Sequence, residues 1–161
     1  MCCLLQVFVS VRRALNGVNF GPVEVSGVVR RSLVIWLLML VVASINGAVR
    51  EALLIPRMGD GAGRAISTLL LSSLVLVLTF GTVRWIGPRS ALDAWIVGGL
   101  WFALTLGFEF LAGHFLFGNP WSQLLDDYNV FRGRIWILVL ITIVLAPRVC
   151  ARARGVLPAS T

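Results

Sequence analysis

Polar and ionisable side chains that could bind a ligand gather in two stretches of an otherwise apolar chain. The first stretch is residues 46–51, and the second is residues 109–134. They hold four of the seven acids of the chain and its one histidine. Carboxylates and imidazole take up protons and cations, whereas arginine binds phosphate or carboxylate. The candidate ligand-binding residues are Asn46, Arg50, Glu51, Glu109, His114, Asp127, Asn129, Arg132 and Arg134.

Glu109 is the most informative of these residues because it interrupts a long apolar run. The run covers residues 94–117, and Glu109 lies eight residues before its end. That places the carboxyl group about 12 Å below the end of a helix. An ionisable group at such depth in a membrane is costly unless it is paired or hydrated, so it is a functional candidate by default. A structural ion pair with Arg50 or Arg132 explains Glu109 equally well, and the sequence leaves both readings open.

His114 follows Glu109 by five residues, which turns the two side chains about 140° apart around an α-helix. They do not share a face, so the spacing provides no metal pair of the Glu-x-x-His kind. We expect neither a metal nor a cofactor. His114 instead lies in line with a row of small residues, which favours an interhelical hydrogen bond over a ligand role.

Small residues at helical spacing predict where the helices come closest together. One such row is Gly99, Ala103 and Gly107, and a shorter one is Ala43 and Gly47. We expect close helix contacts at both rows.

Each of the remaining candidate residues could have a structural role instead of a ligand-binding one. Asn46 and Arg50 are four residues apart on one helix face, where Arg50 could clamp a phosphate or anchor the helix end. The loop with Asp127 and Asn129 lacks the spacing of a calcium-binding loop. These two residues fit better as caps of the next helix or as partners of the arginines that follow.

The candidate side chains must be positioned by the long apolar runs of the chain. These runs also indicate the fold class. The 161 residues are 58% hydrophobic and 13% charged, with a mean hydropathy of +0.93, which is too apolar for a soluble domain of this size. Since about 20 apolar residues cross the hydrocarbon, the runs predict spans at about 32–49, 65–83, 94–117 and 131–150. The fourth is the weakest, because only residues 135–147 are free of charge and the flanking arginines must snorkel. We therefore predict an all-α integral membrane bundle of four transmembrane helices.

The predicted transmembrane domain covers residues 32–150. A cytoplasmic segment is predicted before it, at 1–31, and a tail after it, at 151–161. Glycines and a proline argue against a long helix in the first of these: Gly17, Gly21, Pro22 and Gly27. Cys2, Cys3 and Cys150 form no disulfide framework and are expected to be free thiols.

Arginines set the orientation of the chain, which has fourteen basic residues, all of them arginine. With four spans, nine arginines fall on the side of the termini and five on the other. The positive-inside rule then places both termini in the cytoplasm and the candidate site at the outer face of the cell membrane. The arginines bracket apolar runs and form no single patch, so the expected partner is the lipid bilayer, with or without oligomer partners, and no nucleic acid.

Two motifs resemble a family of small bacterial polytopic membrane proteins of unknown function. They are Asn46-Gly47-Ala48-Val49-Arg50-Glu51 and a second series that runs Gly107-Phe108-Glu109-Phe110, Gly113-His114, Trp121, Asp127-Tyr128-Asn129 and Arg132-Gly133-Arg134-Ile135-Trp136. The resemblance covers roughly residues 32–148. It implies a multi-pass protein of the bacterial inner membrane and assigns no activity.

Three functions fit these observations. The best supported is binding or transport of an ion or a small anionic ligand, such as a lipid headgroup, at the outer polar cluster. A structural or assembly subunit would use the same polar contacts to hold helices together. An enzyme acting on a lipid-linked substrate would use Glu109 or His114 as general base and Arg50 or Arg132 on a phosphate. No nucleophile motif or phosphate loop in the sequence supports the enzyme.

Overall fold

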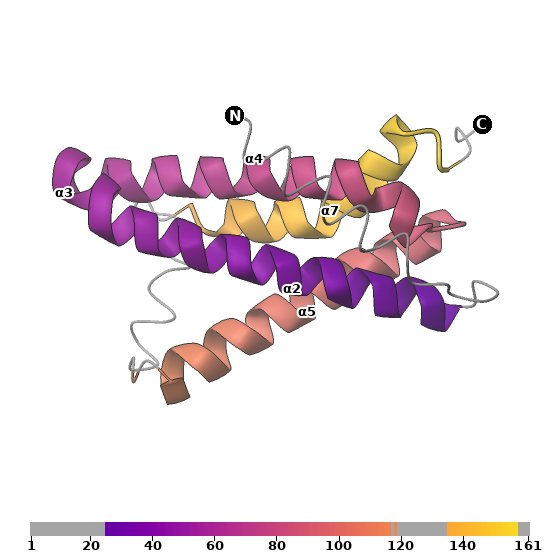
Figure 1. The fold of residues 1–161 in the computed structure, drawn as a ribbon, viewed down its shortest axis with the longest axis horizontal. Helices are drawn as coiled ribbons and strands as arrows, with labels where there is room; N and C mark the ends of the chain where they lie inside the picture. Colours follow the sequence, from indigo (N-terminus) through magenta and orange to yellow (C-terminus); the bar gives the residue numbers. More distant parts are fainter. Residues whose placement is uncertain (1–24, 117, 119–134, 158–161) are drawn as a thin grey trace.

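A computed structural model describes residues 25–116, 118 and 135–157 of the chain. Four of the candidate site residues therefore lie outside the described residues: Asp127, Asn129, Arg132 and Arg134. Every regular element in the described ranges is a helix, and the predicted all-α class is confirmed for them (Figure 1). The elements are α2 (Val25–Val49), the π-helical turn η1 (Arg50–Leu54), α3 (Ile55–Met58), α4 (Asp60–Ile86), α5 (Ala91–Leu111), the π-helical turn η2 (Ala112–Leu116) and α7 (Ile137–Ala153).

Three of the helical stretches are long and apolar enough to cross a membrane. They cover Gly27–Met58, Asp60–Ile86 and Ala91–Phe115. Large apolar side chains point outward from them, for example Leu37, Ile45, Leu69 and Val77. In lipid such side chains need no protein cover. The fourth helix, α7, has 17 residues and is shorter than the roughly 20 residues of a typical span.

The first helix is longer than the sequence predicts at both of its ends. It begins at Val25, so residues 25–31 belong to α2 and Gly27 lies inside the helix. One glycine costs a helix only about 1 kcal/mol, and this helix buries Val28, Ile35 and Met39 in the core. Past residue 49 the chain stays helical through η1 and α3 as far as Met58.

The last helix is shifted toward the C-terminus relative to the predicted span at 131–150. It begins at Ile137 and ends at Ala153, so residues 151–153 belong to α7 and not to the tail. Its end is capped by Gly155 at φ +64°, and Val156 N donates to Ala151 O at 2.9 Å. Glycine adopts this left-handed backbone without steric cost, which makes it the usual residue after a helix end.

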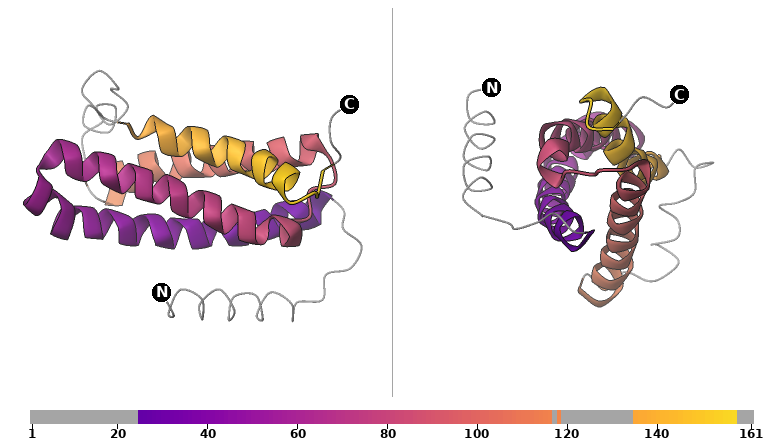
Figure 2. Two further views of the ribbon diagram at one scale, coloured as in Figure 1. Left: turned by 90° about the horizontal axis from the view of Figure 1, so that it is seen from above. Right: turned by 90° about the vertical axis from the view of Figure 1, so that its right-hand side faces the viewer.

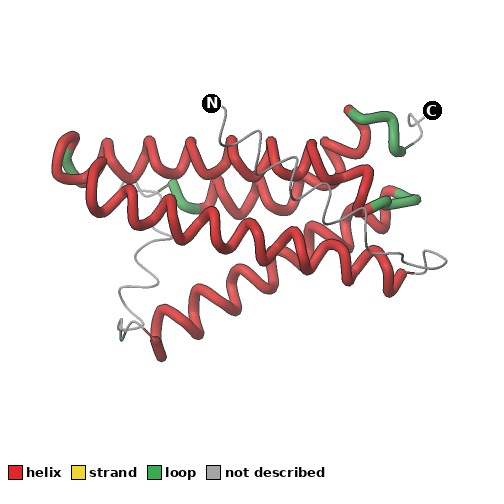
Figure 3. The backbone as a smooth tube through the Cα atoms, viewed as in Figure 1, coloured by secondary structure: helices red, strands yellow, loops and turns green. Residues whose placement is uncertain are grey.

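Glycine also makes the reversal between the first two long helices possible. Gly59 alone separates α3 from α4 and has φ +82°. Figure 3 shows the resulting turn as a short loop between two helices. Such a connection holds α2 and α4 together as antiparallel neighbours.

The core forms where α7 lies against both α4 and α5. A buried row on α7, Val139, Ile143 and Ala146, belongs to the same core cluster as Leu71 and Val75 of α4. The closest approach is between α5 and α7, where a Cβ added to Gly98 would fall on the carbonyl group of Val144. Gly98 is therefore the residue that permits these two backbones to meet.

The predicted close contact at Gly99, Ala103 and Gly107 is wrong. Gly99 and Ala103 are exposed, and no atom lies within 4 Å of a Cβ built on Gly99 or Gly107. The buried face of α5 consists instead of Ala94, Val97, Gly98 and Trp101. The contact predicted at Gly47 is also absent, since a Cβ there meets nothing within 4 Å. These helices are apolar on every side, so the sequence pattern does not reveal which side packs.

The helix ends gather at two opposite ends of the bundle. The start of α2, the end of α4, the start of α5 and the end of α7 lie at one end (Figure 2, left). The α3 turn lies at the other end. There, the C-terminal half of α5 diverges from the remaining helices (Figures 1 and 2).

Candidate functional site

The structure divides the described site residues into two groups. Asn46, Arg50 and Glu51 lie on the end of α2 and on η1, whereas Glu109 and His114 lie on the end of α5 and on η2. Because α5 diverges from α2 toward this end, the two groups occupy separate arms of the bundle (Figure 1). The sequence places all five at the same end, but it does not show that α5 leaves the bundle.

The side chain of Asn46 forms a contact between two helices. Its amide is buried, and Nδ2 donates to Ser67 Oγ at 2.8 Å and to the Ser67 carbonyl oxygen at 3.3 Å. A side-chain amide inside an apolar bundle stabilises helix association in this way. Asn46 therefore holds α2 against α4, which supports its structural reading more than a ligand-binding one.

Arg50 pairs with its neighbour and not with Glu109. Its Nε lies 3.1 Å from Glu51 Oε1, and the two side chains are 27% and 59% exposed. An exposed pair of this kind contributes little to stability. Both residues lie on the π-helical turn η1, an element that is frequently found at functional sites. Arg50 and Glu51 thus remain candidates for an accessible site at the end of α2.

Glu109 points toward the bundle. It is half-buried, and its Oε2 accepts a hydrogen bond of 3.0 Å from Trp136 Nε1 at the start of α7. Such an orientation is expected of a carboxyl group that would be costly in contact with lipid. The indole N–H also fixes where the carboxylate lies within the apolar segment.

Glu109 is the last of three residues on α5 whose side chains share in indole hydrogen bonds. Trp101 Nε1 donates to the Ser32 carbonyl oxygen at 2.8 Å, and Trp36 Nε1 donates to Thr105 Oγ1 at 3.1 Å. Trp101, Thr105 and Glu109 are four residues apart and therefore share one face of the helix. Buried indole N–H groups need an acceptor, especially where water is absent. This row, which we call the indole row, ties α5 to α2 and α7.

Thr105 and Trp101 are not among the residues that the sequence pattern singles out. Their spacing with Glu109 was the available signal, since polar or hydrogen-bonding groups recur every four residues in an apolar run. The partner helices could not be read from that spacing.

His114 lies on η2, half-buried, with its ring edge-on to Phe115 at a centroid distance of 5.0 Å. The angle of 140° predicted between His114 and Glu109 assumes a continuous α-helix, so the π-helical turn changes it. Within the described residues, no three His, Cys, Asp or Glu side chains lie together as a metal site would need. His114 thus remains, together with Glu109, a candidate on the arm of α5.

No family model, curated protein or solved structure matches this chain. The resemblance to small bacterial membrane proteins therefore stays a prediction. A functional proposal has to come from the geometry of the polar groups themselves.

Proposed function

We propose that this chain is a multi-pass membrane protein with four transmembrane helices that binds or transports an ion at Glu109. The position of the Glu109 carboxylate carries the proposal: it is half-buried in an apolar helix and held at 3.0 Å by the Trp136 indole. A carboxylate in such a place favours a proton or a small cation over an anionic ligand, because like charges repel.

The outward side of α7 supports a fourth transmembrane helix. Ile137, Ile141, Leu145 and Val149 recur every four residues and are 41 to 54% exposed. This stripe faces away from the protein while the opposite side packs on α4 and α5. Lipid is the environment that accepts an exposed stripe of this kind. The short length is accommodated if the arginines in the last turns of α7 snorkel to the surface.

Flux through vesicles tests the role of Glu109. We expect reconstituted wild-type protein to dissipate an imposed pH or cation gradient, followed with an enclosed indicator dye. Glu109→Gln should abolish the flux, because the amide still accepts the Trp136 hydrogen bond but carries no exchangeable charge. Asp60→Asn, at the same end but exposed and outside the candidate site, serves as the matched control and should leave the flux unchanged.

If vesicles with Glu109→Gln show the same ion flux as vesicles with the wild-type protein, Glu109 does not bind or transport the ion. The competing function is that of an assembly subunit, and the contact of Asn46 with Ser67 favours it. The thermal midpoint of Glu109→Gln separates the two. A large loss of stability supports assembly, whereas an unchanged or raised midpoint shows that the charge is kept at a cost, as at a functional site.

A further inference from the structure

The end of the bundle opposite Glu109 concentrates positive charge. Among the described residues it carries one acid, Asp93, and seven arginines, which we call the arginine collar: Arg30, Arg31, Arg84, Arg89, Arg148, Arg152 and Arg154. The described residues of the other end hold three arginines and three acids: Arg50, Arg57, Arg64, Glu51, Asp60 and Glu109. The charge of the described chain is thus strongly one-sided.

Asp93 does not neutralise the collar. Its Oδ2 accepts hydrogen bonds from Arg89 N at 2.9 Å and from Ser90 N at 3.1 Å. The bond from Ser90 N and the reciprocal bond from Asp93 N to Ser90 Oγ form the capping box of α5. At the other end, by contrast, acids pair directly with guanidinium groups, in Arg50–Glu51 and Arg64–Asp60. One carboxylate among seven arginines leaves the described residues of this end with a net positive charge.

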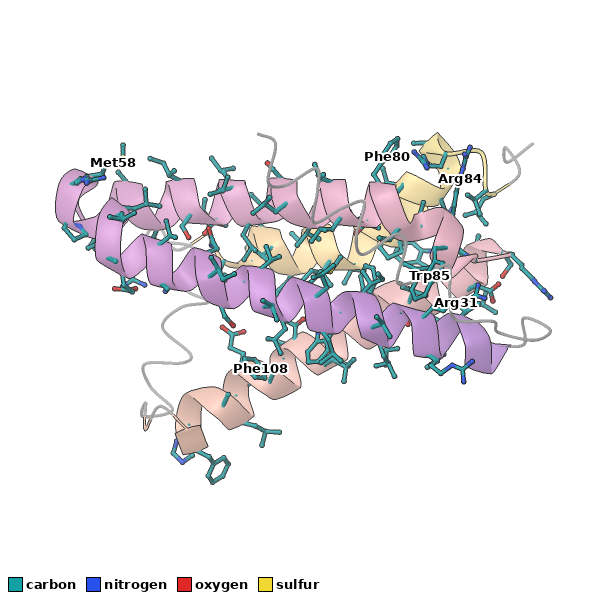
Figure 4. All side chains as sticks on the ribbon, in the orientation of Figure 1. Arg31, Met58, Phe80, Arg84, Trp85 and Phe108 are labelled. Carbon is teal, nitrogen blue, oxygen red and sulfur yellow. The ribbon has the colours of Figure 1, made fainter. Side chains whose placement is uncertain are left out.

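Tertiary contacts bring the collar together from four helix ends. Arg31 Nη1 donates to the Trp85 carbonyl oxygen at 2.9 Å, which joins α2 to α4. Arg84 Nη2 donates to the Arg154 carbonyl oxygen at 3.1 Å, which joins α4 to the end of α7. Figure 4 shows Arg31, Arg84 and Trp85 at this end, with Met58 at the opposite one.

Two aromatic rings hold guanidinium groups at the border of the apolar surface. Arg154 lies 4.7 Å from the centroid of the Phe80 ring, and Arg148 lies 5.2 Å from that of Trp95. Both rings are themselves exposed, at 43% and 38%. Cation–π contacts orient a guanidinium group without cancelling its charge, and exposed aromatic rings mark headgroup depth in membrane proteins.

We infer that the arginine collar binds the phosphate groups of anionic phospholipids. The planar guanidinium fork matches phosphate oxygens, and a basic cluster next to membrane helices attracts anionic leaflets. The exposed apolar stripe of α7 ends at Val149, next to Arg148, so a lipid can place its phosphate on the arginines and its chains along the helix. This site is separate from Glu109 and does not depend on the ion proposal.

Lipid selectivity tests the inference. The full chain is reconstituted in phosphatidylcholine vesicles that contain brominated phosphatidylglycerol or brominated phosphatidylcholine, and quenching of tryptophan fluorescence gives the relative binding constant. We expect phosphatidylglycerol to bind more tightly, on the order of fivefold for each arginine engaged. The triple variant Arg84→Gln, Arg89→Gln, Arg148→Gln should lose most of this preference.

Two matched variants and one added anion complete the test. The same three positions changed to Lys should retain the preference, as should Arg57→Gln at the other end. The inference is overturned if the Gln triple variant keeps the preference or if the Lys triple variant loses it. Anionic lipid should also raise the thermal midpoint, while inorganic phosphate in vesicles of phosphatidylcholine alone should not. An equal rise with inorganic phosphate would overturn the lipid assignment and make free phosphate the ligand.

Discussion

Polar residues inside the apolar helices differ in their chemistry and in their contacts. Asn46 joins α2 to α4 through Ser67, a contact that a packed bundle can use for stability alone. Glu109 is ionisable, and a charged carboxylate is far more expensive in hydrocarbon than an amide. The indole of Trp136 orients the carboxylate. The proposed ion role concerns this carboxylate, whereas the amide of Asn46 needs no role beyond the contact between helices.

Asn46 provides a direct measure of the polar contact between helices. We expect Asn46→Ala to lower the free energy of unfolding by about 1 kcal/mol, which is typical of interhelical hydrogen bonds in membranes. Reversible unfolding in mixed micelles measures it. Ser44→Ala is the control, because the Ser44 hydroxyl is exposed and bonds only within its own helix, to the Leu40 carbonyl oxygen at 2.9 Å. If both variants lose the same stability, the contact with Ser67 contributes nothing specific.

At the scale of the element, α5 shows how one residue position decides a helix interface. Gly98 lies against the backbone of α7, whereas its neighbour Gly99 faces open space. The two glycines are neighbours in the same apolar helix, but one is packed against another backbone and the other is not.

This difference predicts opposite effects of the same substitution. Gly98→Ala forces α5 and α7 apart and should lower the free energy of unfolding by about 1–3 kcal/mol. Gly99→Ala meets no atom and should leave stability unchanged or raise it by up to about 1 kcal/mol, because alanine favours the helix. Thermal unfolding of the two variants in one detergent checks this. If Gly99→Ala lowers the free energy of unfolding more than Gly98→Ala does, the helix interface lies at Gly99, as the sequence pattern predicts.

For the whole molecule, the arginine collar and the positions of the helix ends bear on orientation in the membrane. Cys150 is a poor reporter of orientation, because it is buried with Sγ 3.8 Å from the Leu76 carbonyl oxygen. Exposed positions at the two ends are better: Ala153 beside the collar and Met58 in α3. The proposed topology assigns them to opposite sides of the membrane.

Thiol labelling in intact cells tests this topology. In a chain whose native cysteines are replaced by alanine, Met58→Cys should react with an impermeant reagent. Ala153→Cys should react only after the cells are opened, since the positive-inside rule keeps the collar in the cytoplasm. The reverse labelling pattern would show that the protein has the opposite orientation, with Glu109 near the cytoplasmic face.

The helical class, the three long apolar segments and the end of the bundle that holds the described candidate residues could all be predicted from the sequence. These features depend on local properties, namely the length of apolar runs and the positions of charges between them. The helix ends were less well predicted: Gly27 does not stop α2, because the tertiary contacts of Val28 and Ile35 outweigh a local propensity.

The side on which each helix packs and the pairing of the polar residues could not be predicted from the sequence and are visible only in the fold. Gly98 packs in place of Gly99, Arg50 pairs with Glu51, and Glu109 bonds to Trp136. The physical reason is that lipid accepts apolar side chains on every face of a helix, so no hydrophobic periodicity records the interface. The close approach of α5 to α7 at Gly98, and the divergence of the C-terminal half of α5 that separates the two polar groups (Figure 1), likewise appear only in the fold.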